Sequence, residues 1–120
     1  MMEIIHVING ATATASSVAT PIGDAKKVVL VCKRSAHGSG NTVFSATVSH
    51  DGTNYQTYNK WIRNLANANT EQLTRVASLT LSSNTSDFIT MDPEDFANYI
   101  IVTATETTDG THDAWLIIEY

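Results

Sequence analysis

The sequence predicts an all-β protein: an antiparallel β-sandwich, jelly-roll-like, with an extended N-terminal arm. Three observations support this fold class. Apolar residues recur with a period of two, turn-forming clusters separate these segments at intervals of about a dozen residues, and helical patterns are scarce. Regular short strands divided by turns are typical of sandwiches and closed barrels. The 120 residues have the size of one domain.

The first 24 residues differ in composition from the rest of the chain. The stretch "INGATATASSVATPIGD" is small and polar and ends in a Pro-Ile-Gly turn. It has few bulky apolar side chains to bury, so it would not fold alone. We therefore divide the chain into residues 1–24, an N-terminal arm or an edge strand, and residues 25–120, the β-sandwich domain.

Strand character is strongest in the segments that follow. The β-branched run "VVLV" at residues 28–31 predicts a central strand buried on both faces. Phe44, Ala46 and Val48 alternate with polar residues, which predicts a strand with one apolar face. Three further strands are expected, at residues 75–83, 98–106 and 113–120.

Two segments have weak helical character. Residues 59–77 ("NKWIRNLANANTEQLTRVA") would support a turn or two of helix, although their many asparagines argue against a long one. In "DPED", Asp92 has the position of an N-cap and Pro93 that of the first helical residue, so we expect a single helical turn before the next strand.

The turn "HDGTN" at residues 50–54 is the most prominent short motif. Asp-Gly is a strong hairpin signal, because Gly accepts positive φ and Asp caps its own turn. A second Asp-Gly-Thr turn occupies residues 109–111, and His50 and His112 flank the two turns. A mixed His/Asp metal site would require both turns to meet at one end of the sandwich. Neither "DGTN" nor "DPED" has the spacing of a known calcium loop, so we expect no metal and no cofactor.

Composition argues against several classes of function. The net charge is −5 and the 7 Lys and Arg residues are scattered, which disfavours nucleic-acid binding and a polybasic membrane patch. No stretch approaches the ~20 apolar residues of a membrane-spanning helix, and "MMEIIHVING" lacks the features of a secretory signal. The lone Cys32 lies in an apolar strand, which predicts a buried, reduced thiol. There is no nucleophile elbow and no phosphate-binding loop, so we do not expect an enzyme.

The segment "GSGNTVFSATVSHDGTNYQTYNKW" resembles a pattern in small β-sandwich proteins of tailed-phage virions, where a strand of the form "tvtFevSxDGtnW" leads into an aromatic strand. The C-terminal "YIIVTATETTDGTHDAWLIIEY" is similar to the hairpin that accompanies it. Over residues 26–120, capsid decoration (cement) proteins are the most similar in size. The resemblance implies a virion protein, assembled in the host cytoplasm, that binds the major capsid protein on the capsid surface. It also implies a homotrimer, with residues 1–24 as a strap.

On this interpretation the contacts to the shell come from the arm and from the domain surface. The expected contact residues are Ile4, Ile5, Val7 and Ile8 in the arm, with Trp61 and Arg63 near the domain surface.

Two alternatives stay open. Tail and fibre components share the same strand pattern. The turn "SHDGTNY" also resembles one in discoidin-type carbohydrate-binding sandwiches, where an "S-x-DG-x-x-W" hairpin recurs. Tyr55, Tyr58 and Trp61 follow that turn, and they would either form a sugar-stacking platform or belong to the core or a subunit contact.

Overall fold

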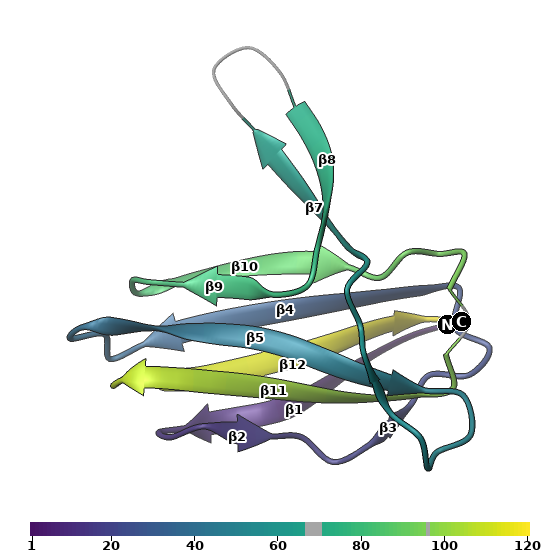
Figure 1. The fold of residues 1–120 in the computed structure, drawn as a ribbon, viewed down its shortest axis with the longest axis horizontal. Helices are drawn as coiled ribbons and strands as arrows, with labels where there is room; N and C mark the ends of the chain where they lie inside the picture. Colours follow the sequence, from purple (N-terminus) through teal and green to yellow (C-terminus); the bar gives the residue numbers. More distant parts are fainter. Residues whose placement is uncertain (67–70, 96) are drawn as a thin grey trace.

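The computed structural model describes residues 1–66, 71–95 and 97–120, which form two antiparallel sheets packed face to face (Figure 1). This confirms the predicted all-β sandwich. The strands are β1 (Met2–Ala11), β2 (Ala15–Ser16), β3 (Thr20–Pro21), β4 (Lys27–Ser35), β5 (Gly40–Ser49), β6 (Gln56–Thr57), β7 (Trp61–Ala66), β8 (Glu71–Val76), β9 (Leu79–Leu81), β10 (Thr85–Thr90), β11 (Tyr99–Thr108) and β12 (Thr111–Glu119).

The first sheet has the order β1-β12-β4-β10-β7-β8, and the second has the order β2-β11-β5-β6. In the second sheet, β3 also pairs with β11, and β9 also pairs with β5. Apart from the local β7–β8 hairpin, neighbours in the first sheet are far apart in the sequence, so long-range pairing holds most of this sheet together. Among the described residues, no helix is long and apolar enough to cross a membrane.

The first 24 residues belong to the sandwich. Strand β1 pairs with β12 from Met2↔Glu119 to Ala11↔His112, while β2 and β3 pair with β11. Of the two interpretations of this segment, the structure therefore shows the edge strand. The side chain of Ile8 is buried in the core, and Ile5 and Val7 pack against it, so they are not free to act as a strap.

The core lies between the sheets and follows the period of two. Its inward-facing side chains come mainly from β4 and β12 in the first sheet and from β5 and β11 in the second. They include Val28, Leu30, Cys32, Phe44, Ala46, Ile100, Val102, Ala104, Leu116 and Ile118. The predicted inward positions in β5 are thus confirmed for Phe44 and Ala46, while Val48 is half-buried. Burial raises the pKa of the Cys32 thiol, which fits the expected inert core cysteine.

Strand β4 differs from its prediction in one respect. It is a central strand, but only one of its faces is covered: Val28 and Leu30 are buried, whereas Val29 and Val31 on the other face are partly exposed. An apolar run predicts burial on both faces, and in this chain nothing among the described residues packs over the second face.

The two predicted helical segments are not helical where the structure describes them. Residues 61–66 and 71–76 form the β7–β8 hairpin instead, and residues 67–70 of the predicted segment lie outside the described residues. At residues 92–95 the chain makes a turn, in which Oδ1 of Asp92 accepts a hydrogen bond from the Glu94 N–H at 3.0 Å. Asp92 caps this turn as predicted, but no helix follows.

Candidate interaction surfaces

The outer face of the first sheet, which points away from the second sheet, is apolar at its centre. Cross-strand registers place its side chains in two rows across β1, β12, β4 and β10: His6–Trp115–Val31–Phe88 and Ile4–Ile117–Val29–Thr90. We call the apolar part the outer-face patch: Ile4, His6, Val29, Val31, Phe88, Trp115 and Ile117. Ile4 is 61% exposed and Phe88 57% exposed, and the central members are half-buried.

Charged residues frame this patch at both ends of the strands. At one end Asp113 of β12 stands opposite Lys33 of β4, and at the other end Glu119 stands opposite Lys27. Each end therefore carries one positive and one negative charge, and the frame has no net charge at neutral pH.

Within the patch, His6 and Trp115 form a stacked pair with ring centroids 4.4 Å apart and an interplanar angle of 11°. Nε2 of His6 lies 2.9 Å from Oδ1 of Asp113, which also accepts a hydrogen bond from the Gly10 N–H at 2.8 Å. These contacts fix the edge strand β1 to β12 and hold the indole of Trp115 in one orientation.

The outer face of the second sheet has a different character. Its cross-strand pairs include Ser45↔Thr103, Thr47↔Ile101 and Val43↔Thr105, so hydroxyl groups are mixed with smaller apolar side chains. Such a surface is readily solvated. The two faces of the sandwich therefore differ in kind, and the apolar one belongs to the first sheet.

A second candidate surface is the β7–β8 hairpin, which projects from the sandwich (Figure 1). Among the described residues, one register pair, Thr90↔Ile62, joins the hairpin to β10 of the first sheet. At its base Trp61 is fully buried, Arg63 Nη2 lies 2.9 Å from Oδ2 of Asp87, and Arg75 pairs with Asp92. The base is thus fixed, while the strands extend beyond the two sheets.

A third cluster surrounds Arg34, whose side chain is fully buried at one end of the sandwich. Its guanidinium donates hydrogen bonds to Nδ1 of His37, Oγ1 of Thr42, the carbonyls of Ser39 and Asp109, and Oδ1 of Asp109. The buried His112 contacts Thr42 Oγ1 at 2.8 Å and Oε1 of Glu106 at 3.2 Å. Because these groups satisfy one another, the cluster acts as a structural tie.

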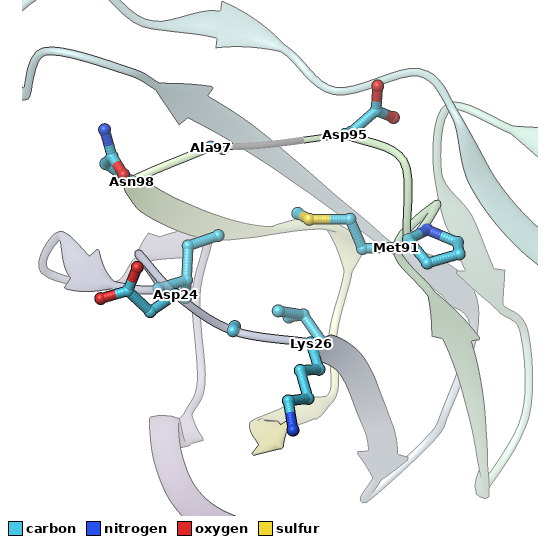
Figure 2. A pocket seen from close by; sticks show the side chains of 10 residues that line it. Asp24, Lys26, Met91, Asp95, Ala97 and Asn98 are labelled. Carbon is cyan, nitrogen blue, oxygen red and sulfur yellow. The ribbon is translucent and has the colours of Figure 1, made fainter. Parts of the chain in front are cut away.

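At the opposite end, a cavity of about 490 Å³ opens between residues 22–28 and 91–98 (Figure 2). Met91 extends into the space, whereas the Lys26 ammonium and the Asp95 carboxylate point away from it. Two of the polar side chains at the rim already have partners: Asp95 accepts a hydrogen bond from the Tyr58 hydroxyl at 2.6 Å, and Asn98 donates to the His50 carbonyl at 2.7 Å. Residue 96 lies outside the described residues, and we assign no ligand to the cavity.

The "HDGTN" turn closes on itself, as predicted. The Asp51 carboxylate accepts hydrogen bonds from the backbone N–H groups of Asn54 and Thr53, at 2.8 and 2.9 Å, and these bonds hold the pKa of Asp51 well below its usual range. Gly52 has φ +80°, as the hairpin signal requires. The second Asp-Gly-Thr turn lies at the other end of β11, so the structure does not bring His50 and His112 together. Among the described residues, no group of three or more potential ligands could hold a metal ion.

The structure separates the predicted contact residues. Ile4 is exposed in the outer-face patch, and Arg63 is half-buried in its ion pair at the hairpin base. Trp61 is fully buried, which corrects the expectation that it lies near the domain surface. The reason is its position at the first residue of β7, where its ring packs edge-to-face on Tyr58 with centroids 5.0 Å apart. Tyr58 and Trp61 are therefore core residues and not a sugar-stacking platform.

Sequence reasoning missed most of the outer-face patch. Val29, Val31, Trp115 and Ile117 belonged to predicted strands, but their common face becomes apparent only from the pairing of β4 with β12. A signal was present in the run at residues 28–31, which is apolar at every position and not at alternate ones.

Comparison with known proteins supports the fold. No protein-family model matches the chain, and no curated protein sequence matches it. The structure is similar to the crystal structure of the SPBc2 prophage-derived protein YomS, with a TM-score of 0.66, 10% identity, and coverage of 99% of this chain and 94% of that one. At this identity the similarity shows a shared fold. Infectious bursal virus derived T=1 particles give a TM-score of 0.31 at 11% identity, covering 98% of this chain and 39% of that chain. This TM-score is too low to indicate a common fold.

Proposed function

We propose that the chain is a structural protein of a tailed-phage particle, and that it acts as a decoration protein on the capsid surface by binding the major capsid protein. Its action would be association without catalysis, and assembly would take place in the host cytoplasm. Support comes from the sequence resemblance over residues 26–120 and from the fold shared with YomS, a protein described as prophage-derived.

The observation that carries the proposal is the projecting β7–β8 hairpin. An isolated two-stranded hairpin is at best marginally stable in water, and stable ones pack against further strands or another element. Here the hairpin meets the first sheet in one register pair, Thr90↔Ile62. We propose that a shell subunit supplies the remaining packing surface, with Arg63 and Asp87 fixing the angle of the hairpin.

Decoration would then be binding by area. A specific interface buries about 800 Å² on each partner, and several modest contacts in one oligomer reinforce one another. Carbohydrate binding is not proposed, because Tyr58 and Trp61 are buried in the core.

The first test is mass spectrometry of purified particles of a phage that carries the gene, separated into heads and tails. We expect the chain in the head fraction. Its presence in tails would instead support a tail or fibre component, and its absence from both fractions would overturn the proposal.

The second test examines the hairpin. Purified protein is added to shells from a phage lacking the gene, and binding is measured by co-sedimentation. Replacing residues 64–73 with Asn-Gly should weaken binding at least about tenfold while cooperative unfolding is retained. Thr105→Ala, on the polar face of the second sheet, is the matched control and should bind like the unmodified chain. Full-strength binding by the shortened hairpin would contradict its role.

A further inference from the structure

The outer-face patch lacks a covering layer within the described chain. Monomeric soluble proteins rarely expose contiguous apolar patches larger than a few hundred Å². The sequence of β4 supports this point. Its apolar run has the composition of a strand that is covered on both faces, but no described residue packs over the face that carries Val29 and Val31. The patch therefore has the properties of an interface.

We propose that the outer-face patch binds a second copy of this chain across a two-fold axis that runs parallel to the strands, between β12 and β4. The axis places β12 of one copy over β4 of the other, and β1 over β10. In this arrangement Trp115 faces Val31 of the second copy, and Ile117 faces Val29. At the margins His6 faces Phe88, and Ile4 faces Thr90. This inference stands on the described surface alone and does not require binding to a shell.

The charged frame identifies a second copy as the occupant. Because Asp113 is opposite Lys33 and Glu119 is opposite Lys27 in each chain, this axis brings each carboxylate over a lysine of the other copy. An isologous interface must be complementary to itself, and the charges of this frame meet that requirement. The chain as a whole has a net charge of −5, so a neutral frame also limits repulsion between copies.

The charges also select the direction of the axis. An axis perpendicular to the strands would place β12 over β12 and β4 over β4, with opposite ends in register. Asp113 would then face Glu119, and Lys33 would face Lys27, so every charged contact would be between like charges. Like-charge contacts disfavour an arrangement strongly.

The size of the patch indicates a weak dimer. With four strands about 4.8 Å apart and a rise of about 3.3 Å per residue, the two rows of the patch cover roughly 250 Å² in projection, and the patch with its charged frame covers roughly 500 Å². The solvent-accessible area of this uneven side-chain surface is greater than its projection. It approaches the area that each partner buries in the smallest specific interfaces. We expect a dissociation constant in the micromolar range, within reach of analytical ultracentrifugation.

The test uses sedimentation of the full chain over a range of concentrations. The expected result is reversible formation of a species with twice the 13.0 kDa mass of the monomer. Phe88→Ser removes an exposed member of the patch and should weaken the dimer about tenfold without unfolding the chain. A chain that stays monomeric at about 200 μM, well above the expected constant, would overturn the proposal, and so would a trimer.

A charge swap tests the axis itself. Lys27→Glu and Glu119→Lys each create two like-charge contacts in a homodimer, so each variant alone should dimerise about tenfold more weakly. An equimolar mixture of the two variants restores both contacts in the heterodimer and should recover the original affinity. Within each variant chain, residues 27 and 119 still carry like charges in the mixture. Recovery of the affinity therefore cannot come from a restored charge pair inside one chain. Failure of the mixture to recover would overturn the proposed axis.

Discussion

The guanidinium of Arg34 lies 3.0 Å from the Asp109 carboxylate, and this pair joins the end of β4 to the turn between β11 and β12. The Asp109 carboxylate also accepts hydrogen bonds from the backbone N–H groups of Gly38 and Ser39, at 3.0 and 3.1 Å. One buried cation thus closes the end of the sandwich where β4 leads into β5 and β11 leads into β12, each connection crossing from one sheet to the other.

Arg34→Met should destabilise the fold without changing its topology. The substitution removes all the hydrogen bonds of the guanidinium and leaves the buried Thr42 hydroxyl and the Ser39 carbonyl short of a donor. We expect a loss of about 3 kcal/mol in the free energy of unfolding, measured by urea denaturation. Arg34→Lys should recover only part of this stability, because an ammonium group cannot reproduce the planar set of donors of the guanidinium. A loss below about 1 kcal/mol would contradict the structural role of the cluster.

Asp109→Asn should destabilise the protein in a pH-dependent way. The backbone N–H of Gly38, with that of Ser39 and the charge of Arg34, holds the pKa of Asp109 below its usual value. A lowered pKa in the folded state stabilises the fold above the unfolded-state value of about 3.9, and this contribution is lost as the pH falls through the folded pKa. The variant should therefore be less stable than the wild type at pH 7, and the difference should narrow below about pH 4. Denaturation curves at both pH values would show this, and a constant difference would refute it.

Gly110→Ala should be more damaging than an ordinary loop substitution. Gly110 has φ +122°, and a Cβ atom there would collide with the Arg34 guanidinium. We expect a cost of roughly 2–4 kcal/mol, from backbone strain and displacement of the buried side chain. Gly10→Ala is the matched control: its φ is +65° but a Cβ would meet nothing within 4 Å, so only the backbone cost of about 1 kcal/mol applies. If thermal unfolding shows that Gly110→Ala and Gly10→Ala lose equal amounts of stability, the contact with Arg34 is unimportant.

Tyr58→Phe should test how the segment before β11 is held. The Tyr58 hydroxyl accepts a hydrogen bond from the buried Asp92 N–H at 2.9 Å and donates to Asp95 at 2.6 Å. Phe retains the ring packing on Trp61 but leaves the Asp92 N–H without this partner, at a cost of about 1–3 kcal/mol. Tyr55→Phe, at a half-buried tyrosine of the same segment, should stay within about 0.5 kcal/mol. Chemical denaturation of both variants would decide whether the hydroxyl contributes.

The sequence was informative where local chemistry decides the conformation. Alternation placed Phe44 and Ala46 in the core, and the Asp51-Gly52 pair marked a hairpin turn, because period and turn preference act within a few residues. It was misleading at residues 61–66 and 71–76. There the helical tendency was weak, and pairing with a partner strand outweighed it, which a local pattern cannot reveal.

The candidate surfaces required the three-dimensional structure. Trp61 follows a turn motif and appeared exposed, but the packing of Tyr58 against it places it in the core. The outer-face patch depends on β1, β12, β4 and β10 being neighbours, and those pairings join residues from both ends of the chain. Register across such distances is set by the whole sandwich and not by any one segment.

The pairing of β1 with β12 has a consequence for the order of folding. Within the part of the chain that the structure describes, the first strand, β1, pairs with the last one, β12, and the backbone N–H of Tyr120 donates to the carbonyl of Met1 at 2.8 Å. During synthesis the N-terminal strand must therefore wait, unpaired, until the C-terminal strand has left the ribosome. Closing so long a loop is slow, and a waiting apolar strand is open to pairing with other chains. Joining the adjacent termini in a circular permutant with new ends elsewhere would make the β1–β12 pair local, so the permutant should fold faster.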